Sequence, residues 1–314
     1  MASAAIKLVS SPFVFLLMLT CPFIWASPLE ILSEEEVKQL ISDGNDVVVL
    51  FSNKVECTGR CEDLEDTLAL IREDVVEALN AWVVRTHSPA LAEEYGLNNK
   101  KVGSEVVFIR KGIPLLYTGH ASDDDFMLHY LVTNTESKVH SLSDVNFEHL
   151  TQAATGATTG DWLVMFSRSG CDTCTQLRAT IEAVAVNLQN QKNVAIIDRD
   201  NDGGQTTRRF GVKTFPSFIL FRQGRMYRYN LPVIDDKTLK SFALEGFRNV
   251  RAEDIPHPKA PFDDYTECIA DWLRENPNVV YTGTAVCVVG ILTIGGLLMW
   301  SSKANTKKLT KKRQ

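Results

Sequence analysis

The chain has 314 residues, a formal net charge of −6 at pH 7 and 45% hydrophobic residues. This length exceeds the usual size of one domain, and the apolar fraction is ample for more than one core. The acidic balance argues against binding to nucleic acid. The six histidines are scattered without the spacing of metal ligands, so the sequence predicts no metal site.

The first residues have the features of a signal peptide. Lys7 precedes an apolar stretch at 13–24, and Ala26 and Ser27 supply small residues suited to cleavage. We therefore predict a signal peptide over 1–26 and a mature chain in the secretory pathway, where disulfides persist. An uncleaved anchor fits less well, because the apolar run is short.

The following segment alternates apolar runs with helical patterns. Their order is helix, strand, helix, strand, helix, strand, strand, helix. The predicted ranges are 34–42, 47–51, 57–79, 82–85, 90–95, 106–110, 115–117 and 125–132. Polar residues at 136–143 then interrupt the apolar periodicity, and the sequence predicts a domain boundary there.

The same order of elements recurs in the second half of the chain. The predicted ranges are 144–150, 162–167, 171–189, 194–198, 206–210, 216–222, 226–230 and 237–247. Phe51-Ser52 aligns with Phe166-Ser167, and Gly112 aligns with Gly224, which indicates a duplication. We expect tandem domains over 27–140 and 141–252, each with a central mixed sheet covered by helices on both faces.

The second copy contains a closely spaced cysteine pair. Cys171 and Cys174 lie where the strand 162–167 meets a helix. Free backbone N–H groups at a helix start stabilise a thiolate, which is the form of cysteine that attacks disulfides. The second cysteine, one turn along, is placed to resolve the mixed disulfide. The alternative is half of a zinc site.

The strand, the CxxC pair and the later Phe215-Pro216-Ser217 resemble the thioredoxin superfamily, specifically membrane-anchored relatives of protein disulfide isomerase. The resemblance implies an α/β fold with two tandem thioredoxin-like domains. It implies Cys171 as the nucleophile, Cys174 as the resolving residue, and a cis-proline at Pro216 that, with Phe215, holds a substrate strand. No cofactor is implied, because the electrons come from thiols. An edge-strand proline is the alternative for Pro216.

The second copy departs from the family at three positions around the pair. The buried acid of the family is replaced by Met165, its aromatic residue by Gly170, and its histidine by Thr173. Asp172 also disfavours the Cys171 thiolate by like-charge repulsion. A less stabilised thiolate leaves the disulfide relatively more stable, so we expect a weaker oxidant than typical isomerases.

The first copy departs further. Its cysteines, Cys57 and Cys61, have CxxxC spacing, and Ser104 stands at the position of Pro216. Residues four apart share a helix face, so a local disulfide is feasible. We predict a binding or structural domain with a structural disulfide; the alternative is a second redox site.

The C-terminal part predicts membrane anchoring. Residues 253–278 form a juxtamembrane linker, residues 279–300 carry no charge and suit a transmembrane helix, and the basic tail 301–314 is expected in the cytosol. Lys311 and Lys312 resemble a retrieval signal of the endoplasmic reticulum, although they also suit a stop-transfer role. Cys268 in the linker either joins two chains or is buried and inert.

Together these features predict a type I protein of the endoplasmic reticulum membrane with most of its chain in the lumen. The predicted function is thiol–disulfide exchange, reductase or isomerase-like, on secretory or membrane proteins that bear disulfides. The alternative is a non-catalytic, membrane-anchored chaperone or client-retention module.

Overall fold

The computed structural model describes residues 29–97, 103–156, 159–258, 261–279, 281–282 and 293. The predicted signal peptide 1–26 and the tail 301–314, with Lys311 and Lys312, lie outside these residues. The chain divides into two compact units. One holds both β-sheets, and the other holds residues 208–210 and the helix α10 (Pro261–Glu275).

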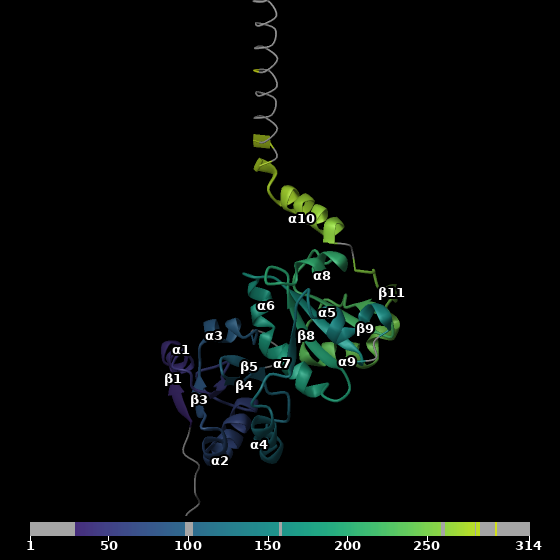
Figure 1. The fold of residues 1–314 in the computed structure, drawn as a ribbon. Coiled ribbons are helices and arrows are strands. Elements are labelled where there is room, and N and C mark those ends of the chain that lie inside the picture. Colours follow the sequence, from purple (N-terminus) through teal and green to yellow (C-terminus); the bar gives the residue numbers. More distant parts are fainter. Residues whose placement is uncertain are drawn as a thin grey trace, which may run out of the picture. The chain divides into compact units, whose positions relative to one another are not determined.

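The first domain is built on a five-stranded sheet with the order β1-β3-β2-β4-β5 (Figure 1). β2 pairs in parallel with β3 and antiparallel with β4. The strands are β1 (Glu30–Leu32), β2 (Val47–Phe51), β3 (Trp82–Thr86), β4 (Glu105–Arg110) and β5 (Ile113–Leu116). The helices are α1 (Glu34–Ser42), α2 (Arg60–Leu79), α3 (Pro89–Glu94) and α4 (Asp124–Thr133).

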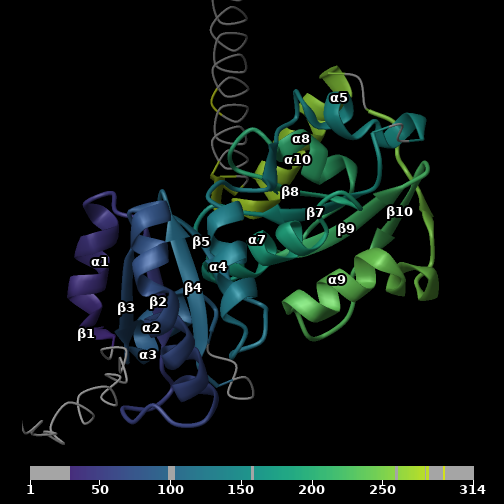
Figure 2. The ribbon, with the colours of Figure 1, turned by 90° about the horizontal axis from the view of Figure 1, so that it is seen from below.

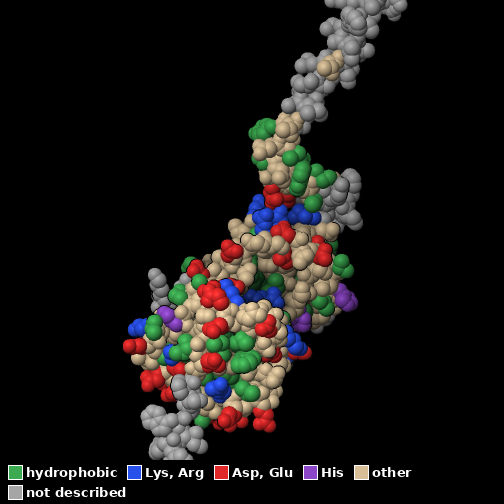
Figure 3. Space-filling model, turned by 90° about the vertical axis from the view of Figure 1, so that its left-hand side faces the viewer, with side chains coloured by type: hydrophobic (Ala, Val, Ile, Leu, Met, Phe, Trp, Pro, Cys, Tyr) green, Lys and Arg blue, Asp and Glu red, His purple; other side chains and the backbone are tan. Residues whose placement is uncertain are grey.

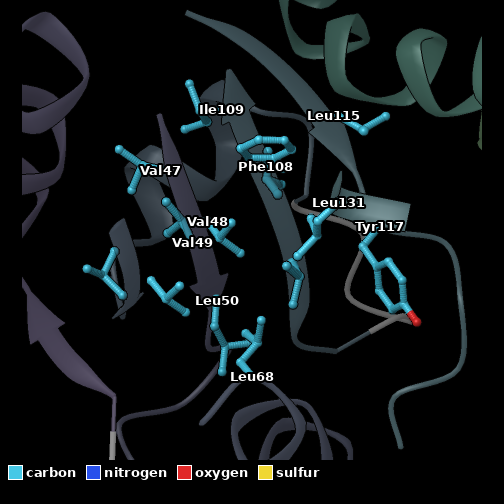
Figure 4. Packing of buried hydrophobic residues seen from close by; sticks show 14 of the residues in the cluster. Val47, Val48, Val49, Leu50, Leu68, Phe108, Ile109, Leu115, Tyr117 and Leu131 are labelled. Carbon is cyan, nitrogen blue, oxygen red and sulfur yellow. The ribbon is translucent and has the colours of Figure 1, made fainter. Parts of the chain in front are cut away.

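The core of the first domain explains why these segments become central strands. Every residue of β2 is buried, as expected for a strand covered on both faces. Its side chains pack with Phe108 and Ile109 of β4, Leu68 of α2 and Leu131 of α4 (Figure 4). Burial of such side chains contributes about 1.5–3 kcal/mol each to folding.

The second domain is built on a six-stranded sheet with the order β11-β10-β9-β7-β8-β6. Its strands are β6 (Val139–Leu142), β7 (Trp162–Ser167), β8 (Asn193–Asp198), β9 (Ser217–Arg222), β10 (Arg225–Arg228) and β11 (Glu253–Asp254). Its helices are α5 (Phe147–Thr151), α6 (Asp172–Gln176), α7 (Arg178–Asn187), α8 (Gly204–Arg209) and α9 (Asp236–Leu244), with 3₁₀ turns at Ala153–Thr155 and Gly246–Asn249. Figure 2 shows α7 between β5 of the first domain and the sheet of the second.

Three strands were not predicted. β1 and β6 each open a domain and pair in parallel with β3 and β8, while β11 pairs with β10. They are two to four residues long, so their sequences carry little periodicity. β6 lies within the stretch that was predicted as the domain boundary, and the predicted linker 253–278 contains β11 and α10.

The predicted helix at 171–189 is interrupted. α6 ends at Gln176 and α7 begins at Arg178, with Leu177 between them. Helical periodicity continues through the break, so the sequence pattern does not reveal it. The break separates the short cysteine-bearing helix from the long buried one.

The structure contradicts one part of the predicted fold class, the C-terminal transmembrane helix. Within the residues that the structure describes, none of the helices combines the length and apolar character needed to cross a bilayer. Of the range 279–300, only 279, 281, 282 and 293 are described. The apolar run in the sequence alone led to the prediction. The part of the fold class that stands is the pair of mixed α/β sheets.

Acidic side chains are spread over the face of the first domain that Figure 3 presents, in its lower part. This agrees with the negative net charge of the chain.

Candidate active site

The cysteines of the second domain lie just beyond the end of β7. A disulfide joins Cys171 to Cys174, whose Cα atoms are 5.2 Å apart. Cys171 is the N-cap residue of α6 and is half-buried, whereas Cys174 lies in the first turn and is 7% exposed. This difference suits the predicted roles, because the attacking sulfur must reach a client and the resolving sulfur need not.

The Cys171 sulfur accepts hydrogen bonds at the start of the helix. The backbone N–H of Cys174 donates to Cys171 Sγ at 3.1 Å, and the Thr173 hydroxyl lies 3.4 Å from the same sulfur. Donors at these positions favour a thiolate once the disulfide opens. The side chain of Asp172 is exposed, so water and salt screen its repulsion of that thiolate.

The Cys174 sulfur lies in apolar surroundings. Cys174 belongs to a cluster of buried side chains that includes Met165 of β7 and Phe218 of β9. Met165 is 1% exposed and cannot accept a proton. Apolar burial disfavours a Cys174 thiolate, and Met165 offers no help in forming one.

Pro216 lies at the same end of the sheet as the cysteines. The Phe215–Pro216 peptide bond is cis, and β9 begins at the next residue. Ser217 pairs with Phe166, the penultimate residue of β7, so Pro216 is next to the strand that leads to Cys171. Phe215 and Cys171 both pack against the same apolar cluster. The role of Phe215 and Pro216 in holding a substrate strand stays a prediction.

The first domain also contains a disulfide. It joins Cys57 to Cys61, with Cα atoms 5.1 Å apart. Cys57 is half-buried in the loop before α2, and Cys61 is the second residue of the helix and 3% exposed. A bonded pair at this place has the local geometry predicted for a structural disulfide, but its redox behaviour stays a prediction.

At the edge next to this disulfide, a serine stands in place of the proline and is contacted by an arginine of the CxxxC loop. Glu105 pairs with Phe51 as Ser217 pairs with Phe166, which places Ser104 at the position of Pro216. Ser104 is 2% exposed, and the Arg60 Nε–H donates to its carbonyl oxygen at 3.3 Å. Arg60 lies between the two cysteines, so the CxxxC loop contacts this edge through one side chain.

Glu105 is a titratable group that the sequence pattern did not single out. It begins β4 directly after Ser104, and burial raises the pKa of its carboxyl group to about 7, against the opposing charge of Arg60. The available signal was an acidic residue at the start of an otherwise apolar strand.

Comparison with known proteins identifies the family. A family model described as Thioredoxin matches residues 138–243. A thioredoxin domain-containing protein of Theileria parva is 34% identical over 155 residues, which cover 49% of this chain and 67% of that protein. This chain belongs to the thioredoxin superfamily.

Solved structures with the same kind of domain are more distant. Full-length ERdj5 is 18% identical with a TM-score of 0.39, and the match covers 70% of this chain but only 31% of the ERdj5 chain. The first thioredoxin domain of mouse protein disulfide-isomerase A4 is 19% identical with a TM-score of 0.31, over 40% of this chain and 89% of that domain. At these scores the likeness supports no argument about activity.

A thioredoxin domain with a half-exposed sulfur bonded to a buried one supports thiol–disulfide exchange. Among the described residues, there is no group of three or more His, Cys, Asp or Glu side chains that is arranged to hold a metal ion.

Two further observations concern Cys268 and Thr173. Cys268 is a free, exposed cysteine on α10, so the buried alternative is excluded, while the predicted link between chains stays a prediction. The sequence pattern missed Thr173 as a hydrogen-bonding partner of Cys171, because the residue was compared only with the histidine of the family.

Proposed function

We propose that this chain is a thiol–disulfide oxidoreductase that acts on disulfide-bearing client proteins in the lumen of the endoplasmic reticulum. The observation that carries the proposal is the unequal burial of the bonded pair, with Cys171 half-buried at a helix start and Cys174 enclosed. The lumenal location rests on the signal-peptide pattern at 1–26 and on the compartment in which disulfides persist.

In the reductive direction, the Cys171 thiolate attacks one sulfur of a client disulfide. A bond forms between Cys171 and that sulfur, and the other client sulfur leaves as a thiolate that takes a proton from water. Cys174 then loses its proton and attacks Cys171 Sγ, which forms the intramolecular disulfide and releases the second client thiol. The client gains two electrons and the cysteine pair loses them. The reverse sequence oxidises a client.

The surroundings of the pair favour the reductive direction. Met165 stands where a buried acid would assist proton transfer, and Thr173 offers only a neutral hydroxyl to the thiolate. The reduced form is therefore stabilised less than in a pair with a cationic neighbour, which makes the pair a weaker oxidant.

Trapping of clients tests the proposal. Cys174→Ala removes the resolving sulfur, so we expect client proteins to accumulate as mixed disulfides that dissolve on reduction with dithiothreitol. Cys171→Ala should trap none, and Cys57→Ala/Cys61→Ala should leave trapping by Cys174→Ala unchanged. The readout is non-reducing electrophoresis after acid quenching.

Equal capture by the Cys171→Ala and Cys174→Ala variants would contradict exchange through Cys171. Client binding that persists in the Cys171→Ala/Cys174→Ala double variant, with no covalent complex in any variant, would instead support the chaperone alternative.

A further inference from the structure

The helix that follows the active-site pair is shared between the two sheet domains. All residues from Ala179 to Ala185 are buried, which is the signature of a helix covered on every side. Ala179 and Ala183 belong to the apolar core of the first domain, whereas Ile181 and Val184 belong to that of the second. The small alanine side chains allow β5 to approach α7 closely.

A buried ion pair fixes this contact. Arg110 at the end of β4 donates to Glu182 Oε2 of α7 at 3.0 Å and to the Glu136 carbonyl oxygen at 3.2 Å. The Ser137 hydroxyl donates to the other oxygen of Glu182 at 2.6 Å. Arg110 is 1% exposed, and burial lowers its pKa while Glu182 opposes that effect. Farther along α7, Asn187 donates to Thr118 at 3.1 Å.

The first domain also contacts the cysteine-bearing helix itself. Gly96, just beyond α3, has a φ of +72°, and a Cβ built there would lie 2.4 Å from the Gln176 carbonyl oxygen. Gln176 ends α6, two residues after Cys174. The obstacle is backbone, so no side-chain rotation relieves the clash. A Cβ at residue 96 must therefore displace α6, the first domain, or both.

We infer that Gly96 of the first domain is a positioning residue for the Cys171–Cys174 pair, and that the first domain sets the reactivity of this pair by holding α6 in place. The inference rests on the proposed function. The backbone N–H of Cys174, on α6, donates to Cys171 Sγ at 3.1 Å. α6 has only five residues, and the clash falls on its last one, so relieving it distorts the single turn that carries this bond. The bond then lengthens, and a thiolate with a weaker donor is less stable relative to the disulfide.

The test compares two glycines that have nearly the same positive φ, at which an alanine would be strained. Gly112, in the turn between β4 and β5, has a φ of +75°, and a Cβ there would meet nothing within 4 Å. Gly96→Ala and Gly112→Ala therefore impose a similar conformational cost, but only the first adds a clash with α6. The measurements are the equilibrium of Cys171–Cys174 with glutathione and the pH profile of Cys171 alkylation in the full chain.

For Gly96→Ala we expect the equilibrium to shift at least about threefold toward the disulfide, because the thiolate loses part of a charge-assisted hydrogen bond. The alkylation profile should move to higher pH. Gly112→Ala should match the wild type in both. Identical values for Gly96→Ala and the wild type, or equal shifts in both glycine variants, would overturn the inference.

A second variant keeps the inference testable if Gly96→Ala does not fold. Glu182→Gln weakens the same domain contact, because it removes one charge of the buried ion pair while preserving side-chain volume, and it should shift the equilibrium in the same direction. An unshifted equilibrium in this folded variant would overturn the inference. If the wild type and Gly112→Ala show no reversible exchange with glutathione, the proposed function fails. If they exchange and the domain-contact variants match them, only the positioning role fails.

Discussion

At the residue scale, Glu105 shows how burial changes a titratable group without creating an ion pair. Its carboxyl group lies at the start of a buried strand, and burial raises its pKa from the ordinary value of 4.5 to about 7. The folded protein therefore holds this proton more tightly than the unfolded chain does. Its contribution to stability is complete below about pH 4.5 and is lost as the pH rises to about 7.

Glu105→Gln should remove this pH dependence. Each pKa unit corresponds to about 1.4 kcal/mol of free energy. The free energy of unfolding of the variant, relative to that of the wild type, should therefore be up to about 3 kcal/mol higher above pH 7 than at pH 4.5. Urea denaturation at pH 4.5 and pH 8 measures both differences. Parallel stability profiles for the variant and the wild type would show that Glu105 titrates normally.

Some residues of the candidate site can be predicted from the sequence, whereas others are recognised only from their contacts in the folded chain. Cys171, Cys174 and Pro216 follow from motif and spacing, and Ser104 follows from the repeat, as the strand register shows. The hydrogen bond from Arg60 to Ser104 does not follow from spacing, because Arg60 reads as an exposed residue at the start of a helix. The contact of the Thr173 hydroxyl with Cys171 Sγ could be recognised only from the shape of the α6 turn.

At the element scale, long and strongly patterned segments were predictable. The ranges of α1 and β2 match the predicted ones, since a capping box at Ser33 and an unbroken apolar run mark them. β1 and β6 were missed because short parallel edge strands depend on partners that are distant in the chain. The sharing of α7 was also hidden, because Glu182 in its sequence suggests a solvated face.

The buried pair on α7 makes an energetic prediction. Glu182→Leu leaves Arg110 buried without its carboxylate, so we expect a loss of about 3–5 kcal/mol in the free energy of unfolding. Arg110→Met/Glu182→Leu should recover most of that loss, because neither charge then remains buried. A double-mutant cycle by urea denaturation measures the coupling.

The exposed pair between Lys38 and Glu34, four residues apart on α1, serves as a control. Its coupling energy should be much smaller than that of the buried pair, because water and salt screen exposed charges. Coupling energies of similar size for the two pairs would contradict the account of Arg110 and Glu182 as a fixed contact between the domains.

At the scale of the whole molecule, the two sheet domains share an architecture and differ in chemistry. In the second domain, the half-buried Cys171 and the cis-proline Pro216 lie at the same end of the sheet. At the corresponding end of the first sheet, the Arg60 side chain donates a hydrogen bond to the carbonyl oxygen of Ser104. We expect exchange to be confined to the second domain, with the first acting as its support. The positions at which the two domains differ are Ser104 in place of Pro216 and the CxxxC spacing in place of CxxC.

The most direct test of this division is the reduction potential of each pair in the full chain. The protein is equilibrated in glutathione buffers, its free thiols are alkylated, and each pair is quantified by mass spectrometry. We predict reversible reduction of Cys171–Cys174 with a midpoint more negative than about −180 mV, the value for protein disulfide isomerase, while Cys57–Cys61 stays oxidised over that range. A Cys171–Cys174 pair that resists reduction, or that titrates at or above about −180 mV, would contradict the account.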